Sequence, residues 1–243
     1  MTIPRRIEPE WLDELAADDP RAIQSRADLR RVNALMGTTS LITREFKRNI
    51  PAGSSKIIAE LGAGDGTLML RLARKIATWR KDVQVVLLDQ QDIVSPETLG
   101  GFHPLGWRAE SVVTDVFTWL EQPTEQVYDV IIANLFLHHF DTERLALLLS
   151  LAAQRTRLFI ACEPRRSSLA FLGSHLLGLV GCNDVSRHDA VISVCAGFSG
   201  QELSALWPAS SAWVLQENAY GLFSHCFVAT KINGNASSRY EDV

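Results

Sequence analysis

Residues 57–73 constrain the fold of this chain more than any other stretch. They read IIAELGAGDGTLMLRLA, in which an apolar run leads to glycines at positions 62, 64 and 66, and an amphipathic segment follows. Glycines let the backbone turn tightly and approach a ligand closely, and the first N–H groups of a helix offer positive potential. The stretch therefore predicts a strand, a glycine-rich turn and a helix, with room for a ligand at the turn.

From residue 56 onward, short apolar runs alternate with longer amphipathic stretches, which is typical of a mostly parallel sheet covered by helices. Strands are predicted at Ile57–Leu61, Val83–Asp89, Glu110–Thr114, Tyr128–Ala133 and Leu158–Cys162. Helices are predicted at Thr67–Trp79, about Ser95–Leu99, Asp141–Ala153, Ser167–Val180 and Gly200–Leu206. Two further runs, Ala212–Ala219 and Leu222–Lys231, are separated only by Tyr220 and Gly221 and predict an antiparallel hairpin at a sheet edge.

The ends of the chain are predicted to differ from its middle. Residues 8–49 are typical of two helices, broken once at Asp18-Asp19-Pro20, and the polar residues 233–243 are expected to be disordered. The first 20 residues include the acids Glu8, Glu10, Asp13 and Glu14 and no apolar run, so no secretory signal is expected. The longest apolar run, Leu169–Cys182, is shorter than the roughly 20 residues that cross a bilayer. We therefore expect a cytoplasmic protein without a transmembrane segment.

Charge and cysteine spacing exclude some function classes. The formal charge of the 243 residues is −4, which gives no global attraction to a nucleic-acid backbone. The four cysteines never come within the C-x-x-C spacing of a metal or redox site, so no metal is expected.

The glycine-rich turn itself separates two classes of nucleotide-binding fold. A dinucleotide fingerprint, G-x-G-x-x-G, would need a glycine at position 67, which is a threonine, and this conflicts with a nicotinamide oxidoreductase. The pattern E-x-G-x-G-x-G that begins at Glu60 instead resembles the first motif of the class I S-adenosylmethionine-dependent methyltransferases. Matching motifs extend over about residues 50–165.

This resemblance implies a Rossmann-like α/β fold with a seven-stranded, mostly parallel sheet in the order 3-2-1-4-5-7-6. It also implies a helical lid at residues 1–50, a methyltransferase domain at 51–232 and, within it, a substrate insertion at about 165–200.

The resemblance further assigns a binding site for S-adenosylmethionine, the expected cofactor. Asp89 ends the second strand 23 residues after the last glycine of the turn, a spacing at which a carboxylate can accept from both ribose hydroxyls. In the family the next residue, here Gln90, lies beside the adenine, and Asp115 matches the acid that accepts from the adenine amino group. The expected cofactor-binding residues are Glu60, Gly62, Gly64, Gly66, Asp89, Gln90, Asp115, Val116 and Asn134.

The acceptor is expected to be a small molecule. Family members that methylate nucleic-acid bases follow strand four with Asn or Asp, two prolines and an aromatic residue, whereas this chain has Asn-Leu-Phe-Leu at 134–137. Residues 11–37 and 187–203 are similar to methyltransferases of bacterial polyketide or quinone-type pathways. The resemblance thus favours O-methylation of a phenolic or polyketide-like hydroxyl. C- or N-methylation of a small molecule, or a non-catalytic donor-binding domain acting through a partner, are the alternatives.

A hydroxyl acceptor would gain from a nearby base, and three histidines are candidates. His138 and His139 directly follow strand four, and His188 lies in the expected insertion, where Asp189 could orient its ring. We rank His139 ahead of His188, although each of the first two could be a hydrogen-bonded structural histidine and His188 could lie in a solvated loop.

The residues that follow the fifth strand could either contact the acceptor or lie on the protein surface. Glu163 could face the cleft, and Arg165 and Arg166 could bind an anionic acceptor or form a solvated face. The apolar run 169–182 could line an acceptor pocket or touch a membrane surface; because a helix there would be apolar nearly all round, burial is favoured.

Overall fold

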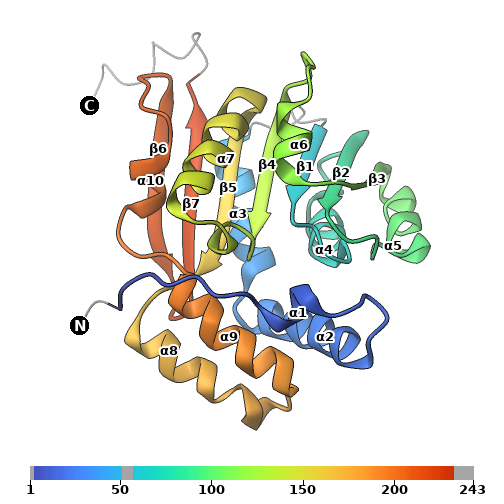
Figure 1. The fold of residues 1–243 in the computed structure, drawn as a ribbon. Helices are drawn as coiled ribbons and strands as arrows, with labels where there is room; N and C mark the ends of the chain where they lie inside the picture. The colour runs from blue at the N-terminus through green and yellow to red at the C-terminus, as the bar shows by residue number, and fades with distance from the viewer. Residues whose placement is uncertain (1–2, 51–56, 233–243) are drawn as a thin grey trace.

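The computed structural model describes residues 3–50 and 57–232, and its centre is a seven-stranded sheet with helices on both faces (Figure 1). The strand order is β3-β2-β1-β4-β5-β7-β6, as predicted. Strands β1 to β5 are parallel to one another, and β7 is antiparallel to both β5 and β6. The carboxyl ends of the five parallel strands therefore meet at one edge of the sheet.

The strand bounds follow the apolar runs closely. The strands are β1 (Ile57–Leu61), β2 (Val83–Asp89), β3 (Trp107–Val113), β4 (Tyr128–Asn134), β5 (Thr156–Pro164), β6 (Trp213–Tyr220) and β7 (Ser224–Lys231). Strand β3 begins before the predicted Glu110 because Trp107 pairs with Val83. The predicted two-residue turn between the last two strands is wrong, since Tyr220 pairs with Ser224 and residues 221–223 form the connection.

The helices of the described residues are α1 (Trp11–Glu14), α2 (Pro20–Leu35), α3 (Thr38–Asn49), α4 (Thr67–Ile76), α5 (Pro96–Gly100), α6 (Val116–Glu121), α7 (Thr142–Arg155), α8 (Ser168–His175), α9 (Asp184–Ala196) and α10 (Glu202–Leu206). Short 3-10 turns are η1 (His103–Leu105), η2 (Leu137–His139) and η3 (Leu177–Val180). Three helices precede β1 where two were predicted, because Gly37 turns the chain between α2 and α3 with a φ of +70°. None of these helices is long and apolar enough to cross a bilayer.

Alternate residues of the strands face opposite helical layers, which explains their nearly continuous apolar sequences. In β2, Val85 and Leu87 pack in the cluster formed with α3 and α4. Their neighbours Val86 and Leu88 pack in the cluster formed with α6, α7 and α10. Both faces of the sheet are therefore covered, and only its carboxyl edge is available to a ligand.

A further group of helices lies beyond that edge. Figure 1 shows α1, α2, α8 and α9 together below the carboxyl ends of β4 and β5. Helix α9 contacts the other three. Asp28 of α2 accepts hydrogen bonds from the Asn183 N–H and the Ser186 hydroxyl at the start of α9. The N-terminal helices and the segment after β5, far apart in sequence, thus form one layer over the sheet edge.

The apolar run 169–182 departs from its prediction in two ways. It divides into α8 and η3 instead of forming one helix, and its outer side chains are exposed, so the expectation of full burial is wrong. The physical reason is its position: the segment lies at the outside of the helical group, with only one side against the rest of the molecule (Figure 1).

Candidate active site

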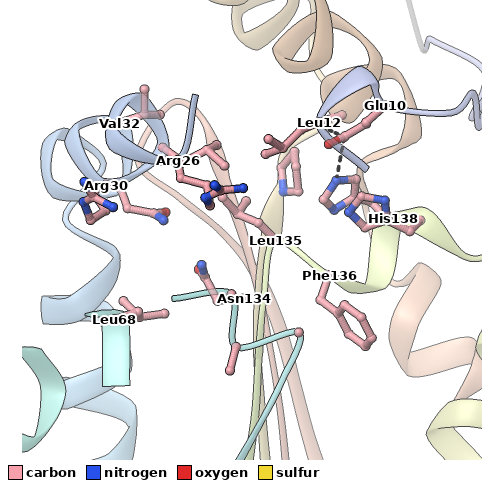
Figure 2. Close-up of a pocket in the computed structure, with 18 of the residues that line it drawn as sticks. Glu10, Leu12, Arg26, Arg30, Val32, Leu68, Asn134, Leu135, Phe136 and His138 are labelled. Carbon is pink, nitrogen blue, oxygen red and sulfur yellow. Dashed lines mark hydrogen bonds and ion pairs between the residues drawn. The ribbon is translucent and has the colours of Figure 1, made fainter. Parts of the chain in front are cut away.

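A cavity of about 570 Å³ lies between the carboxyl edge of the sheet and the helices beyond it. The turn after β1 and the residues that follow β2, β3 and β4 line one side, and α2, α8, α9 and the N-terminal segment line the other. In Figure 2, Arg26, Arg30 and Val32 of α2 lie across the cavity from Glu10 and His138. The position matches the rule that open α/β sheets bind ligands at the strand carboxyl ends.

The glycines of the turn after β1 have different neighbours. All three adopt positive φ, at +66° for Gly62, +55° for Gly64 and +73° for Gly66. A Cβ at Gly64 would meet nothing within 4 Å, and Gly64 lines the cavity, so a ligand could approach its backbone there. A Cβ at Gly66 would lie 2.8 Å from the Leu87 side chain. Gly66 therefore packs the turn onto the sheet and does not line the cavity, and its donor contact stays a prediction.

Glu60, at the end of β1, is a buried carboxylate that lines the cavity. Its Oε2 atom has no hydrogen-bond partner among the described residues. Burial raises the pKa of Glu60 well above its usual value, and the charges of Asp65 and Asp89 raise it further. An unpartnered buried acceptor is costly for the protein alone, which indicates that a cationic ligand group completes this site.

Asp89 lines the cavity at the end of β2, where the prediction placed it. Its Oδ2 accepts from the Gly64 N–H at 2.8 Å and its Oδ1 from the Gln91 N–H at 2.9 Å. A carboxylate has about four acceptor positions, so two remain for a ligand. Gln90 also lines the cavity, and its amide donates to Asp115 at 3.2 Å.

Asp115 has a local structural task. Its Oδ1 accepts from the N–H groups of Phe117 and Thr118 and so caps the start of α6. Asp115 itself does not line the cavity, whereas its neighbours Thr114 and Val116 do. The Asp115 carboxylate is thus held by α6 through Oδ1 and by Gln90 through Oδ2, and its expected adenine contact stays a prediction.

Strand β4 ends in a second unpartnered polar group. Asn134 lines the cavity, and no partner is found for its buried Oδ1 among the described residues. Leu135, the next residue, has a φ of +51°, which costs a non-glycine residue about 1–2 kcal/mol. The Leu135 N–H donates to the Cys162 carbonyl at 2.9 Å, which holds the strained turn against β5. Strain of this kind is characteristic of ligand sites.

His138 is buried at the cavity wall between two carboxylates. Its Nδ1 lies 2.7 Å from Glu163 Oε2 and its Nε2 lies 3.2 Å from Glu10 Oε1. Glu163, fully buried at the end of β5, also accepts from two backbone N–H groups of the turn after β4. Glu10 additionally accepts from the Ser193 hydroxyl of α9. The imidazole is therefore fixed in orientation by residues of three other segments.

The two carboxylates determine the charge of His138. Burial alone would lower its pKa, but the hydrogen bonds to Glu10 and Glu163 outweigh burial and raise the pKa to about 9. Burial likewise opposes ionisation of Glu10, whereas the hydrogen bond and charge of His138 lower the pKa of Glu10 to about 2. At neutral pH the free protein thus holds an imidazolium between two carboxylates.

The other two candidate histidines occupy different surroundings. His139 lines the cavity, and its Nδ1 lies 3.4 Å from an Asp13 carboxylate oxygen. Glu10, His138 and His139 place potential metal-ligand atoms within 4.8 Å of one another, although both ring nitrogens of His138 already have carboxylate partners.

His188 is paired with Asp189 as predicted, at 3.0 Å, but it does not line the cavity. Its ring stacks on Trp11 with centroids 3.7 Å apart. His188 is thus outside the residues that line the cavity in this structure, and its role as a base stays a prediction. It lies on α9, not in a solvated loop, and its ring helps to hold the N-terminal segment.

The remaining polar residues after β5 also differ from expectation. Glu163 supports His138 and does not itself face the cavity. Arg166 neither binds in the cavity nor forms a solvated face, because it pairs with Glu202 and donates to the Ile3 carbonyl. Arg165 donates to the Gly221 carbonyl at 3.2 Å.

Several cavity residues come from the N-terminal segment, and among them the charged Glu10, Arg26 and Arg30 were not predicted as site residues. Arg30 pairs with Asp65 of the glycine-rich turn at 2.6 Å, which ties α2 to the sheet. No spacing in the sequence marks these residues, since each reaches the cavity only through the packing of α1 and α2.

The chain resembles known proteins in its fold, whereas its sequence similarity to them is low. No model of a known protein family matches the chain, and no curated protein does. Among solved structures, an O-methyltransferase family protein from Burkholderia thailandensis is 15% identical with a TM-score of 0.61, over 90% of this chain and 62% of that one. A putative O-methyltransferase from Nostoc punctiforme is 14% identical with a TM-score of 0.57, over 86% of this chain and 60% of the other. The chain has the methyltransferase fold.

A third similar structure with the methyltransferase fold is the N,N-8-amino-8-demethyl-D-riboflavin dimethyltransferase of Streptomyces davawensis. It is 14% identical, with a TM-score of 0.55 over 92% of this chain and 62% of that one. The chain spans about three fifths of the length of these three proteins. The predicted architecture is thereby confirmed at the level of the fold.

Proposed function

We propose that the chain is an S-adenosylmethionine-dependent methyltransferase that methylates the hydroxyl of a small, largely apolar acceptor in the cytoplasm. The observation that carries the proposal is one cavity lined by both polar and apolar groups, in which we assign a polar end to the donor and an apolar end to the acceptor. One end presents Glu60, Asp89 and an open glycine backbone, and the other is apolar with one oriented histidine.

The polar end of the cavity fits the donor. The unpartnered carboxylate of Glu60 suits an ammonium group, the free acceptor positions of Asp89 suit the ribose hydroxyls, and the space beside Gly64 suits the chain between them. Arg26 and Arg30 are the cations on the opposite wall that suit a carboxylate. When bound, S-adenosylmethionine supplies a methyl group on a sulfonium centre that is open to in-line attack.

The apolar end fits the acceptor. Its walls include Leu29, Phe140, Leu177 and Phe223, which can hold a ring or a hydrocarbon chain and exclude water. In the proposed arrangement, residues 1–50 act as the lid and the insertion at about 165–200 provides the acceptor wall.

His138 is the proposed proton acceptor. Buried Glu163 holds its Nδ1, so Nε2 is the nitrogen available to a ligand, as in other carboxylate–histidine pairs. Glu10 occupies Nε2 in the free protein, so the acceptor oxygen would displace the Glu10 carboxylate there. Loss of one of its two carboxylate partners lowers the pKa of His138, so its Nε2 proton leaves to solvent as Glu10 is displaced. The neutral imidazole then accepts the hydroxyl proton at Nε2. His139, ranked higher from sequence, has no buried partner.

Two alternatives remain distinct from this proposal. N-methylation has one specific point in its favour, because one similar structure is named as a dimethyltransferase of an amino-flavin. C-methylation and a non-catalytic donor-binding domain would use the same polar end. An amine acceptor can lose its proton after attack, so neither N-methylation nor donor binding alone requires His138.

The test measures transfer of a labelled methyl group to a panel of phenols, amines and polyketide-like acceptors. His138→Ala should lower turnover of a phenol by about 10²- to 10⁴-fold, the usual value of a general base, with donor affinity by calorimetry unchanged. His188→Ala is the matched control and should retain turnover. In the parent, kcat/KM should rise with pH up to about 9, since this ratio reports the free protein and the pKa of His138 there is about 9.

Failure would take recognisable forms. Donor binding without turnover of any acceptor would support the non-catalytic alternative. Turnover that survives in both His138→Ala and His139→Ala would exclude a histidine base and favour an amine or carbon acceptor.

A further inference from the structure

Helix α8 and turn η3 carry a line of exposed aliphatic side chains. The line, called here the apolar stripe, consists of Leu169, Leu172, Leu176, Leu179 and Val180. These positions follow helical spacing and so share one side of the segment. Leu179 is 83% exposed and Leu172 is 59% exposed, and the other three are about half exposed. Single exposed leucines are ordinary on protein surfaces, but a contiguous patch of this kind marks an interaction site.

The same segment also forms a wall of the cavity. Ala170, Gly173, Ser174 and Leu177, which lie on its other side, line the cavity. One turn of helix therefore separates the acceptor end of the cavity from the apolar stripe.

The connection between β6 and β7 extends the apolar surface. Leu222 is exposed, and Phe223 is partly exposed while also lining the cavity. Phe223 packs directly on α8, where a Cβ at Gly173 would lie 2.6 Å from its ring. The apolar stripe and this connection thus border the cavity from two sides.

Basic side chains flank the apolar surface. Arg165 lies at the connection, where it donates to the Gly221 carbonyl, and exposed Arg187 lies against η3 at Gly178. Between residues 165 and 188 the sequence holds three arginines and a single acid, Asp184. Because Arg166 is paired with Glu202, the net positive charge beside the apolar stripe comes from Arg165 and Arg187 against Asp184, in a chain whose overall charge is −4.

We propose that the apolar stripe, with Leu222 and Phe223, inserts into the surface of a membrane that contains anionic lipids. Apolar side chains bordered by arginines match the layered chemistry of such a surface, where acyl chains lie beneath negatively charged headgroups. A second copy of the chain fits less well, because a symmetric contact through this face would bring Arg165 and Arg187 of two copies together.

Because the apolar stripe lies beside the cavity, membrane contact would bring the cavity close to compounds dissolved in the bilayer. If the cavity methylates an apolar acceptor, which rests on the function proposed above, the membrane surface is where such an acceptor accumulates. The substrate class inferred is then a lipophilic hydroxyl compound that partitions into the bilayer. Membrane binding itself requires neither donor nor turnover, so the two proposals fail independently.

The experiment is flotation of the full chain with vesicles of phosphatidylcholine alone or with phosphatidylglycerol added. The chain should float with the phosphatidylglycerol vesicles, less so as salt rises, and weakly or not at all with phosphatidylcholine alone. Leu172→Asp and Leu179→Asp should each weaken binding at least tenfold, because a buried leucine is replaced by a charge. Arg187→Glu should weaken it roughly fivefold or more.

Matched controls separate the stripe from general effects. Leu147→Asp changes a comparably exposed leucine on α7, and Lys81→Glu reverses an exposed charge remote from the stripe. Both should bind vesicles like the parent, and all variants should bind the donor equally in calorimetry.

Two outcomes would overturn the proposal. One is no binding to either vesicle, or equal binding by Leu179→Asp and the parent. The other is a dimer in sedimentation that Leu179→Asp converts to a monomer, which would make the stripe a self-association surface.

Discussion

Single residues at the cavity depart from rules that most of the molecule obeys. Elsewhere in the described residues, Ser204 and Trp207 each have one unpartnered side-chain atom and Asp82 has a positive φ. Buried polar atoms in folded proteins nearly always have hydrogen-bond partners. Glu60 and Asn134, which both line the cavity, have unpartnered side-chain oxygens. Leu135, which also lines the cavity, has a left-handed backbone conformation. These departures coincide at one place, which is the pattern expected where a ligand completes the structure.

Glu60→Gln tests the donor contact. Because burial already favours the neutral form of Glu60, an isosteric amide should change the free energy of unfolding by about 1 kcal/mol or less. Donor affinity in calorimetry should fall by about 1.5–3 kcal/mol, the value of a hydrogen bond to a charged group. Glu110→Gln, an exposed acid on β3, is the control and should leave affinity unchanged. Equal affinity in both variants would remove Glu60 from the donor site.

Gly64→Ala tests the open space beside the turn. The added Cβ meets no protein atom within 4 Å, so the structural cost is that of a left-handed alanine, about 1 kcal/mol. Donor affinity should nevertheless fall at least tenfold, because the methyl group occupies ligand space. Gly37→Ala changes a glycine that also has a positive φ, at +70° against +55° for Gly64, and nothing within 4 Å of an added Cβ, but that does not line the cavity. It should show the stability loss alone; an equal loss of affinity would mean that backbone strain, not ligand contact, is responsible.

At the scale of elements, α9 connects the helices over the cavity. Asp189 accepts from the N–H groups of Trp11 and Leu12, at 2.9 Å and 3.0 Å, and so holds α1. Ser186, one turn earlier, is bonded to Ser25 of α2. The N-terminal segment is therefore attached to the segment after β5 as well as to the sheet, and the two should move together.

Asp189→Ala should release the N-terminal segment. Loss of two backbone acceptor contacts costs roughly 1–3 kcal/mol of local stability, which raises the population of the open segment tenfold or more. Limited trypsin digestion should then cleave after Arg5 or Arg6 at least several times faster. Asp184→Ala, which changes an exposed acid at the start of the same helix, should digest like the parent. Unchanged digestion in both variants would show that Asp189 does not anchor the segment.

At the scale of the whole molecule, the cluster around His138 joins four separate parts of the chain. Glu10 comes from the N-terminal segment, His138 follows β4, Glu163 ends β5 and Ser193 lies on α9. Titration of this cluster should therefore affect the stability of the entire fold.

The stability should depend on pH in a defined way. The pKa of His138 rises from 6.5 to about 9 on folding, so its contribution is complete below about 6.5 and lost as pH rises through about 9. The pKa of Glu10 falls from 4.5 to about 2, so its contribution is complete above about 4.5 and lost as pH falls through about 2. Urea unfolding should thus show a maximum between about pH 4.5 and 6.5 and a decline toward pH 9.

Glu10→Gln checks the assignment to this cluster. It removes one carboxylate from His138, so the alkaline decline should begin at lower pH, whereas His188→Ala should keep the parent profile. A parent with equal unfolding free energy at pH 6 and pH 9.5 would refute the linkage.

The sequence by itself determined the sheet and its ligand edge. The apolar runs, the glycine-rich turn and Asp89 are local patterns, because strand periodicity, turn conformation and a strand's carboxyl end are properties of contiguous residues. It left undecided which histidine has a buried partner, since Glu163 and Glu10 reach His138 from 25 and 128 positions away. Gly66 and Asp115 match a motif, yet only packing shows that one supports the turn and the other caps α6. Tertiary structure likewise decided which helices cover the cavity and which side of α8 is exposed. The burial of a helix face depends on the segments that pack against it, and the residues of that face do not specify those segments.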